Sequence, residues 1–131
     1  MRRSHLLKGA VLAALIAAPF PVLAADAAGE IVTAATHADL ASKAGNLAGT
    51  KIHLHHVLNC LVGPGGADFD PTNINPCVNA GSGAIPDTAD AAKKAKLEAA
   101  AATVRAGLAA DDLAVAQKDA ADAAKALQGI K

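Results

Sequence analysis

The sequence predicts an all-α protein, a small three- or four-helix bundle, and three observations lead to this prediction. Apolar residues make up 53% of the 131 residues, but aromatic residues make up only 2%. In two long stretches the apolar residues recur in steps of three and four, which is the repeat of helices that bury one face. Between these stretches lies a segment rich in Gly and Pro, where regular structure is not expected. We therefore expect two helical regions joined by a long loop.

Residues 1–24 have the order of a cleaved export signal. A basic stretch from Met1 to Lys8 precedes an apolar run from Gly9 to Ala18, and Val22-Leu23-Ala24 is typical of a signal-peptidase site. The apolar run is shorter than the about 20 residues that a membrane-spanning helix needs, so we expect no transmembrane segment in the mature protein. The pattern predicts one mature domain, residues 25–131, in the bacterial periplasm or secreted. General and twin-arginine export both stay open.

Removal of the signal changes the charge balance. Three of the 12 basic residues, Arg2, Arg3 and Lys8, lie in the signal, so nine basic side chains face 12 acidic ones in the mature chain. Nucleic-acid binding requires a basic face, and we expect none here. Residues 25–131 contain 30 alanines and one aromatic side chain, Phe69. Because an alanine buries little surface, we expect a thin core, with association into a homo-oligomer as one way to bury more.

The first helical region is predicted over residues 29–62. Two glycines, Gly45 and Gly49, weaken its middle, because each costs about 1 kcal/mol relative to Ala in a helix. We expect either one long helix with a close helix crossing at these glycines, or a break, with Thr50 capping a second, collinear helix. The residues of the repeat are Ile31, Ala34, Ala38, Ala41, Gly45, Ala48, Ile52, His55, Asn59 and Val62.

The loop predicted over residues 63–86 is expected to be held by a disulfide. Cys60 and Cys77 are the only cysteines, and in an oxidising compartment two cysteines are first interpreted as a disulfide. This bond would close a loop of about 17 residues and contribute roughly 3 kcal/mol in the chain-entropy model.

The second helical region, residues 87–128, is Ala-rich and is predicted to be a helical hairpin. Asp87 or Thr88 is the expected N-cap of its first helix, because both follow a proline and precede the apolar repeat. The turn is expected between Gly107 and Asp111, with Asp111 capping the second helix.

A histidine cluster on the first helical region is the strongest candidate for a ligand site. On a helix, His53 and His56 lie on one side, and the candidate third donor is His37 or a residue of a neighbouring chain. Imidazole is a good ligand for Zn, Cu or Ni, so these residues predict a site for one of these ions. Cys60 follows His56 by four residues, but a cysteine in a disulfide cannot bind a metal. His55 points away from His56 and is expected to be a core histidine bonded to Asn59 or a carbonyl.

No catalytic motif is present, and we expect no enzymatic activity. The chain lacks the H-E-x-x-H, C-x-x-C and G-x-S-x-G patterns. Two functions of different classes remain: a periplasmic metal-binding protein, and an envelope structural or interaction protein whose disulfide-tied loop contacts a protein partner. The loop residues expected to contact that partner are Asp68, Phe69, Asp70, Asn73 and Asn75.

Overall fold

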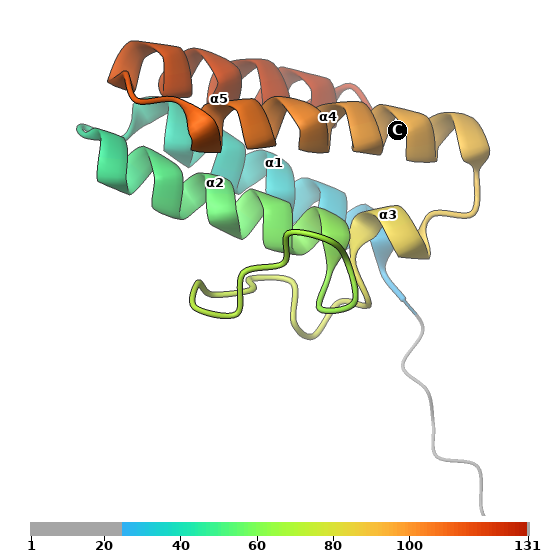
Figure 1. Ribbon diagram of the computed structural model, residues 1–131. Helices are drawn as coiled ribbons and strands as arrows, with labels where there is room; N and C mark the ends of the chain where they lie inside the picture. Colours follow the sequence, from blue (N-terminus) through green and yellow to red (C-terminus); the bar gives the residue numbers. More distant parts are fainter. Residues whose placement is uncertain (1–24, 131) are drawn as a thin grey trace, which may run out of the picture.

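The computed structural model describes residues 25–130, and over these residues the chain is all-helical, as predicted (Figure 1). The predicted export signal, residues 1–24, lies outside the described residues. No helix within them is long and apolar enough to cross a membrane. The helices are α1 (Ala27–Lys43), α2 (Leu47–Val62), α3 (Ala84–Asp87), α4 (Ala91–Ala109) and α5 (Leu113–Gln128).

The first helical region is an antiparallel hairpin of α1 and α2 (Figure 1). The expectation of one long helix or two collinear helices is therefore wrong. The chain leaves the helix at Ala44, whose backbone is extended, and Asn46 caps α2 by accepting a hydrogen bond from the Gly49 N–H at 2.8 Å. Thr50, the expected cap, lies fully buried inside α2. The break near Gly45 is confirmed, but it reverses the direction of the chain.

The Ala-rich region forms the predicted hairpin, α4 and α5, with different end residues. Asp90 caps α4, and its side chain accepts from the Lys93 N–H. Asp87, one of the two expected caps, instead ends the short helix α3. Asp112, rather than its neighbour Asp111, caps α5. The predicted N-caps of α4 and α5 therefore lie one to three residues before the observed ones, and the observed caps are aspartates, as expected.

The two hairpins stack into a four-helix bundle in which α1 packs chiefly against α5 and α2 (Figure 1). The thin core is confirmed, because every fully inward position of α1 after Ile31 is an alanine. The larger core side chains come from the other helices. The fully buried leucines and valines are Leu54, Leu58, Leu61, Leu97, Leu127, Val57 and Val104, each at most 2% exposed.

The loop after α2 begins and ends at the same place. Gly63 has φ +67°, and a Cβ there would lie 1.6 Å from the Ser82 carbonyl oxygen. Gly83 has φ +117°, and a Cβ there would lie 2.6 Å from the Gly63 nitrogen. Both positions therefore need glycine, for backbone conformation and for space. The contact closes the segment between them into a loop lying beside the end of α2.

Gly107, near the end of α4, lies close to side chains of α2 and α5. A Cβ on buried Gly107 would lie 2.9 Å from Leu54 Cδ1 and 3.1 Å from Asp119 Cβ. Although Ala is the better helix former, Gly107→Ala should reduce the free energy of unfolding by about 1–3 kcal/mol through overpacking. Urea unfolding measures this change. Gly45→Ala is the matched control, because its Cβ would meet no atom within 4 Å, and equal stability of the two variants would contradict the packing argument.

A buried acid joins the start of α1 to the end of the loop. Glu30 is fully buried, and its Oε1 accepts from the Gly83 N–H at 3.0 Å, while Oε2 has no hydrogen-bond partner among the described residues. The Asp87 carboxylate lies nearby and accepts from the Ser82 N–H at 2.6 Å. Burial, followed by the negative charge of Asp87, raises the pKa of Glu30 to about 7. Glu30 is therefore largely protonated in the folded protein under weakly acidic conditions.

This raised pKa predicts that ionisation of Glu30 destabilises the folded protein as pH rises. In the unfolded chain Glu30 ionises near pH 4.5, and in the folded chain near 7, so the stabilisation from its proton is lost as pH rises across this window. Glu30→Gln keeps an acceptor for Gly83 and removes the ionisation. Relative to the original protein, it should therefore gain about 2 kcal/mol in free energy of unfolding between pH 5 and pH 8. Histidine contributions cancel in this difference, and a difference that is constant with pH would show that Glu30 titrates normally.

Candidate metal site

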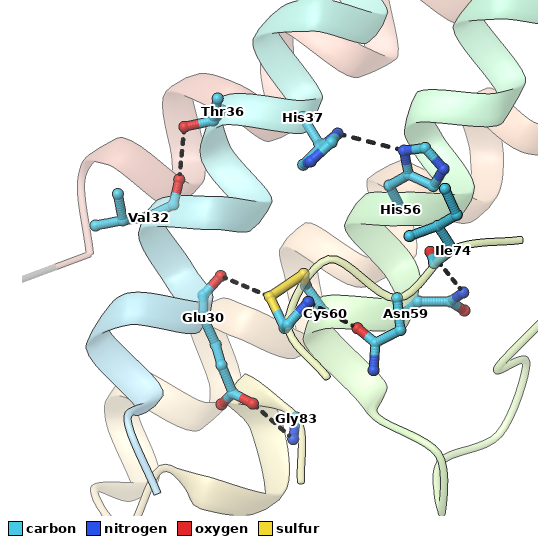
Figure 2. The surroundings of a disulfide bond; sticks show 11 residues. Glu30, Val32, Thr36, His37, His56, Asn59, Cys60, Ile74 and Gly83 are labelled. Atoms are coloured by element: carbon cyan, nitrogen blue, oxygen red, sulfur yellow. Dashed lines mark hydrogen bonds between the residues drawn. A yellow bond between two sulfur atoms is a disulfide. The ribbon is translucent and has the colours of Figure 1, made fainter. Parts of the chain in front are cut away.

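The α1–α2 hairpin brings three histidines together. His37 projects from the middle of α1 toward α2, where His53 and His56 lie one turn apart; Figure 2 shows His37 and His56 facing each other. Helix α2 runs back along α1 after the three-residue turn, so residues separated by 16 and 19 positions become neighbours. We call His37, His53 and His56 the histidine triad. His56 is buried, and the other two side chains are partly exposed.

The three imidazoles meet through the same ring atom. His37 Nδ1 lies 3.3 Å from His53 Nδ1 and 3.3 Å from His56 Nδ1. One nitrogen from each ring lies within 4.8 Å of the other two, an arrangement that could hold a metal ion. The rings of His37 and His56 are perpendicular, with centroids 5.0 Å apart. Nitrogen atoms therefore face one another, and the rings do not stack in parallel.

Hydrogen bonds among the three rings cannot satisfy all three Nδ1 atoms well. Nδ1 of a neutral histidine carries either one proton or one lone pair. His37 Nδ1 therefore either divides one proton between two acceptors or offers one lone pair to two donors. Both separations are also slightly longer than a good hydrogen bond. A cation between the rings would use all three lone pairs at once.

The surroundings favour neutral rings. Burial lowers the pKa of His37 and of His56 below the usual 6.5, and the neighbouring histidines lower both further. After burial, the next contribution to the lowered pKa of His37 comes from the charge of His53. For His56, the next contribution after burial comes from the charge of His37. Because a metal ion binds the deprotonated nitrogen, these rings are in the state needed for ligation at neutral pH.

The disulfide lies next to the triad and does not belong to it. Cys60 and Cys77 are bonded, as predicted, with their Cα atoms 5.2 Å apart. Cys60 lies one helical turn beyond His56 on α2, and the Cys77 sulfur faces the Glu30 carbonyl oxygen at 3.8 Å (Figure 2). Neither cysteine has a free thiol, so neither is a metal ligand in this state. The bond attaches the loop to α2.

His55 has a different environment from the triad. Its Nδ1 lies 3.4 Å from Asp70 Oδ2, so a protonated His55 forms an ion pair with the loop. The expected bond to Asn59 or a carbonyl is absent among the described residues. Hydrogen bonds from the Thr72 hydroxyl and N–H, and then from Asn73, lower the pKa of Asp70 to about 2, with His55 a smaller cause. His55 therefore contacts a carboxylate that is always charged at neutral pH.

Asn59 holds the loop through both atoms of its amide. Its Oδ1 accepts from the Asp70 N–H at 2.9 Å, and its Nδ2 donates to the Asp70 carbonyl at 2.9 Å. Longer bonds of 3.3 Å reach the carbonyl of Asn73 and that of Ile74; Figure 2 shows the bond to Ile74. Asn59 itself is fully buried. A side chain that appeared to be part of a helical repeat thus supplies the backbone partners that the irregular loop lacks.

The loop residues predicted to contact a partner make many contacts within the chain. Asp68 pairs with Arg105 of α4 at 2.8 Å, and Phe69 packs against the core. Asp70 and Asn73 belong to the Asn59 network, and Asn75 Oδ1 accepts from the Cys77 N–H. A role of these residues in partner binding stays a prediction.

Two large apolar side chains of the loop, neither of them among the residues predicted to contact a partner, are exposed. Ile74 is 70% exposed and Val78 is 65% exposed. Alternating turns and prolines gave no periodicity from which their orientation could be predicted. On a loop fixed by Asn59 and the disulfide, these side chains are held in solvent by the backbone.

Comparison with known proteins identifies no relative: no protein-family model matches the chain, and no curated protein or solved structure shows significant similarity to it. The function must therefore be argued from the residues themselves.

Removal of the Asn59 amide should release the loop. Asn59→Ala leaves the Asp70 N–H and up to three carbonyls without their partner, and should reduce the free energy of unfolding by about 2–4 kcal/mol. Hydrogen exchange should become faster at the Asp70 amide and its neighbours. Asn79→Ala is the control, because Asn79 is exposed and should change stability by less than about 0.5 kcal/mol. Unchanged exchange in Asn59→Ala would mean that the disulfide alone orders the loop.

Proposed function

We propose that this protein binds a late transition-metal ion, Cu, Zn or Ni, at the histidine triad, and that it does so outside the cytoplasm. The observation that carries the proposal is the convergence of three imidazole Nδ1 atoms from two helices, with two separations of 3.3 Å. Histidines that only make a surface soluble are expected to point their ring nitrogens into solvent, and these three point them toward one another.

The chemistry of the donors supports this choice of ions. Imidazole nitrogen is a borderline-soft ligand that suits Zn, Cu and Ni, while Mg and Ca prefer oxygen. The triad contains no carboxylate, and burial keeps His37 and His56 neutral. A hard cation would therefore find no preferred ligand in the triad.

Location outside the cytoplasm is supported by two separate features. The Cys60–Cys77 disulfide is typical of oxidising compartments, and residues 1–24 have the composition of an export signal. We propose the periplasm or secretion as the location, with a purpose in binding or carrying metal and without catalysis.

Metal stoichiometry of histidine variants tests the proposal. The untagged protein, stripped of metal, is dialysed against Zn(II), Cu(II) or Ni(II), and bound metal is counted by elemental analysis. We expect one ion per chain for at least one metal, and loss of that ion in His37→Ala and in the double variant His53→Ala/His56→Ala, because each leaves fewer than three donors.

His55→Ala is the matched control for this experiment. His55 lies on the same helix between the two ligands but faces Asp70, so its removal should leave the stoichiometry at one. Equal metal binding by the original protein and by a variant lacking all three triad histidines would exclude the proposed function.

A second candidate function, an envelope interaction protein, is favoured by one observation. Ile74 and Val78 are exposed apolar residues on a loop that is fixed to the bundle, and exposed apolar patches are typical of binding surfaces. Cross-linking in intact cells compares the original protein with Ile74→Ser/Val78→Ser. A defined cross-linked partner that is lost in the variant would favour this function, and identical patterns would count against it.

A further inference from the structure

The spacing of the triad also indicates which coordination geometry the site prefers. We infer that the site takes a tetrahedral ion with a filled d shell, Zn(II) or Cu(I), through three Nδ1 atoms, and that a ligand from outside the chain completes the fourth position. The inference rests on the proposed function and makes it more specific: the bound ion is exchangeable and remains open to a second molecule.

The distances between donor atoms carry the first step. A bond from zinc to histidine nitrogen is about 2.0–2.1 Å long, so two nitrogens at the tetrahedral angle lie about 3.3–3.4 Å apart. Adjacent ligands at 90°, as in octahedral or square-planar sites, would lie about 2.8–3.0 Å apart with the same bond lengths. The two separations that include His37 Nδ1, both 3.3 Å, match the tetrahedral value, and the ligand nitrogens of His53 and His56 lie within 4.8 Å of each other. Closing to the shorter spacing would require the His37 ring to move nearer to the rings on α2, by rotation of the side chains or by closer packing of α1 and α2.

Such an approach meets resistance from the packing. Helix α1 already carries fully buried alanines, Ala34 and Ala38, on either side of His37, and α2 has fully buried Leu54 and Val57 beside the other two ligands. Interiors are packed at the density of organic crystals, so helices that touch through methyl groups cannot come much closer. The bundle therefore opposes a closer approach of the two helices, and only the side chains are left to adjust the donor spacing.

The fourth position carries the second step. Among residues 25–130, the triad is the only group of three or more histidine, cysteine or acidic side chains with suitable spacing, and it supplies three donors. The nearest further donors on α2 are engaged elsewhere: His55 faces Asp70, and Cys60 is bonded to Cys77. His37 and His53 are partly exposed, so solvent reaches the site. Three histidines with one open position are also the donor set of exchangeable and catalytic zinc sites.

Substitution with Co(II) tests the geometry directly. Co(II) in a four-coordinate site has strong visible absorption, and six-coordinate Co(II) absorbs weakly. We expect strong bands at one Co(II) per chain for the original protein and for His55→Ala. Weak absorption at full occupancy would overturn the inference and leave the proposed function intact, whereas absence of bound metal in every assay would remove the proposed function itself.

Metal competition gives an independent readout. We expect Zn(II) to bind at least tenfold more tightly than Ni(II), and Cu(I), measured anaerobically against a chromophoric chelator, to occupy the same three histidines. Whichever of Zn(II) and Cu(I) binds more tightly identifies the favoured ion. Binding of Ni(II) that is as tight as or tighter than that of both Zn(II) and Cu(I) would contradict a tetrahedral filled-shell site.

The open position is tested with a small ligand. Azide or free imidazole added to the Co(II) protein should shift the visible bands in a saturable manner, because it replaces a solvent ligand. The same titration of His55→Ala should give the same shift. A spectrum that does not change up to high azide and imidazole concentrations would show that a fourth side chain closes the site, and would overturn this part of the inference.

Discussion

Helix α1 presents alanine at nearly every inward position, so its axis must come close to those of α2 and α5 before any van der Waals contact forms. Ala34, Ala38 and Ala41 are fully buried, and none has a side chain that could bridge a wider gap. The rest of the structure depends on this close packing. It aligns α1 with α2 along most of their length, and it determines how near His37 can come to the two histidines of α2. Because methyl groups separate α1 from its neighbours, the distance between the helix axes is short, and this brings the histidines of the triad within reach of one another.

The sequence was sufficient for the helical class, the disulfide and the placing of His53 and His56 on one side of a helix, because each depends on local composition, local spacing or a single available pairing. His37 was only a candidate third donor, since its approach to the other two histidines depends on the reversal of the chain. The direction of the chain at Gly45 was not predictable from periodicity. A repeat of threes and fours continues from Ile31 to Val62 whether the chain bends or not, and the turn resets its phase. Ile52, part of the repeat, is accordingly 48% exposed, while Thr50 and Leu54 are fully buried. Tertiary packing determines which residues of α2 face the core, and no local feature of the sequence indicates which set that is.

The loop illustrates a second limit. Its fixed shape depends on Asn59, whose amide bonds carbonyls and an N–H that lie 11–15 residues further along the chain. Asparagine in a helix is usually interpreted as a surface residue, because its amide competes with the helical backbone. Only the folded structure shows that the amide supplies hydrogen bonds to loop backbone groups, which in a strand or helix would bond to other backbone groups. His55 was misassigned for the same reason, since its partner Asp70 is brought near by Asn59.

The disulfide and an ion bound at the triad would close two segments that follow one another along the chain and are not nested. The disulfide spans residues 60–77, and an ion at the triad would span residues 37–56, so the two closed segments share no residue. In the unfolded chain each cross-link would then remove the freedom of its own loop, and the two entropic contributions would add. A reductant would open only the second segment and a chelator only the first. One small domain would thus have two separately addressable constraints, one responding to the redox state of its surroundings and the other to their metal content.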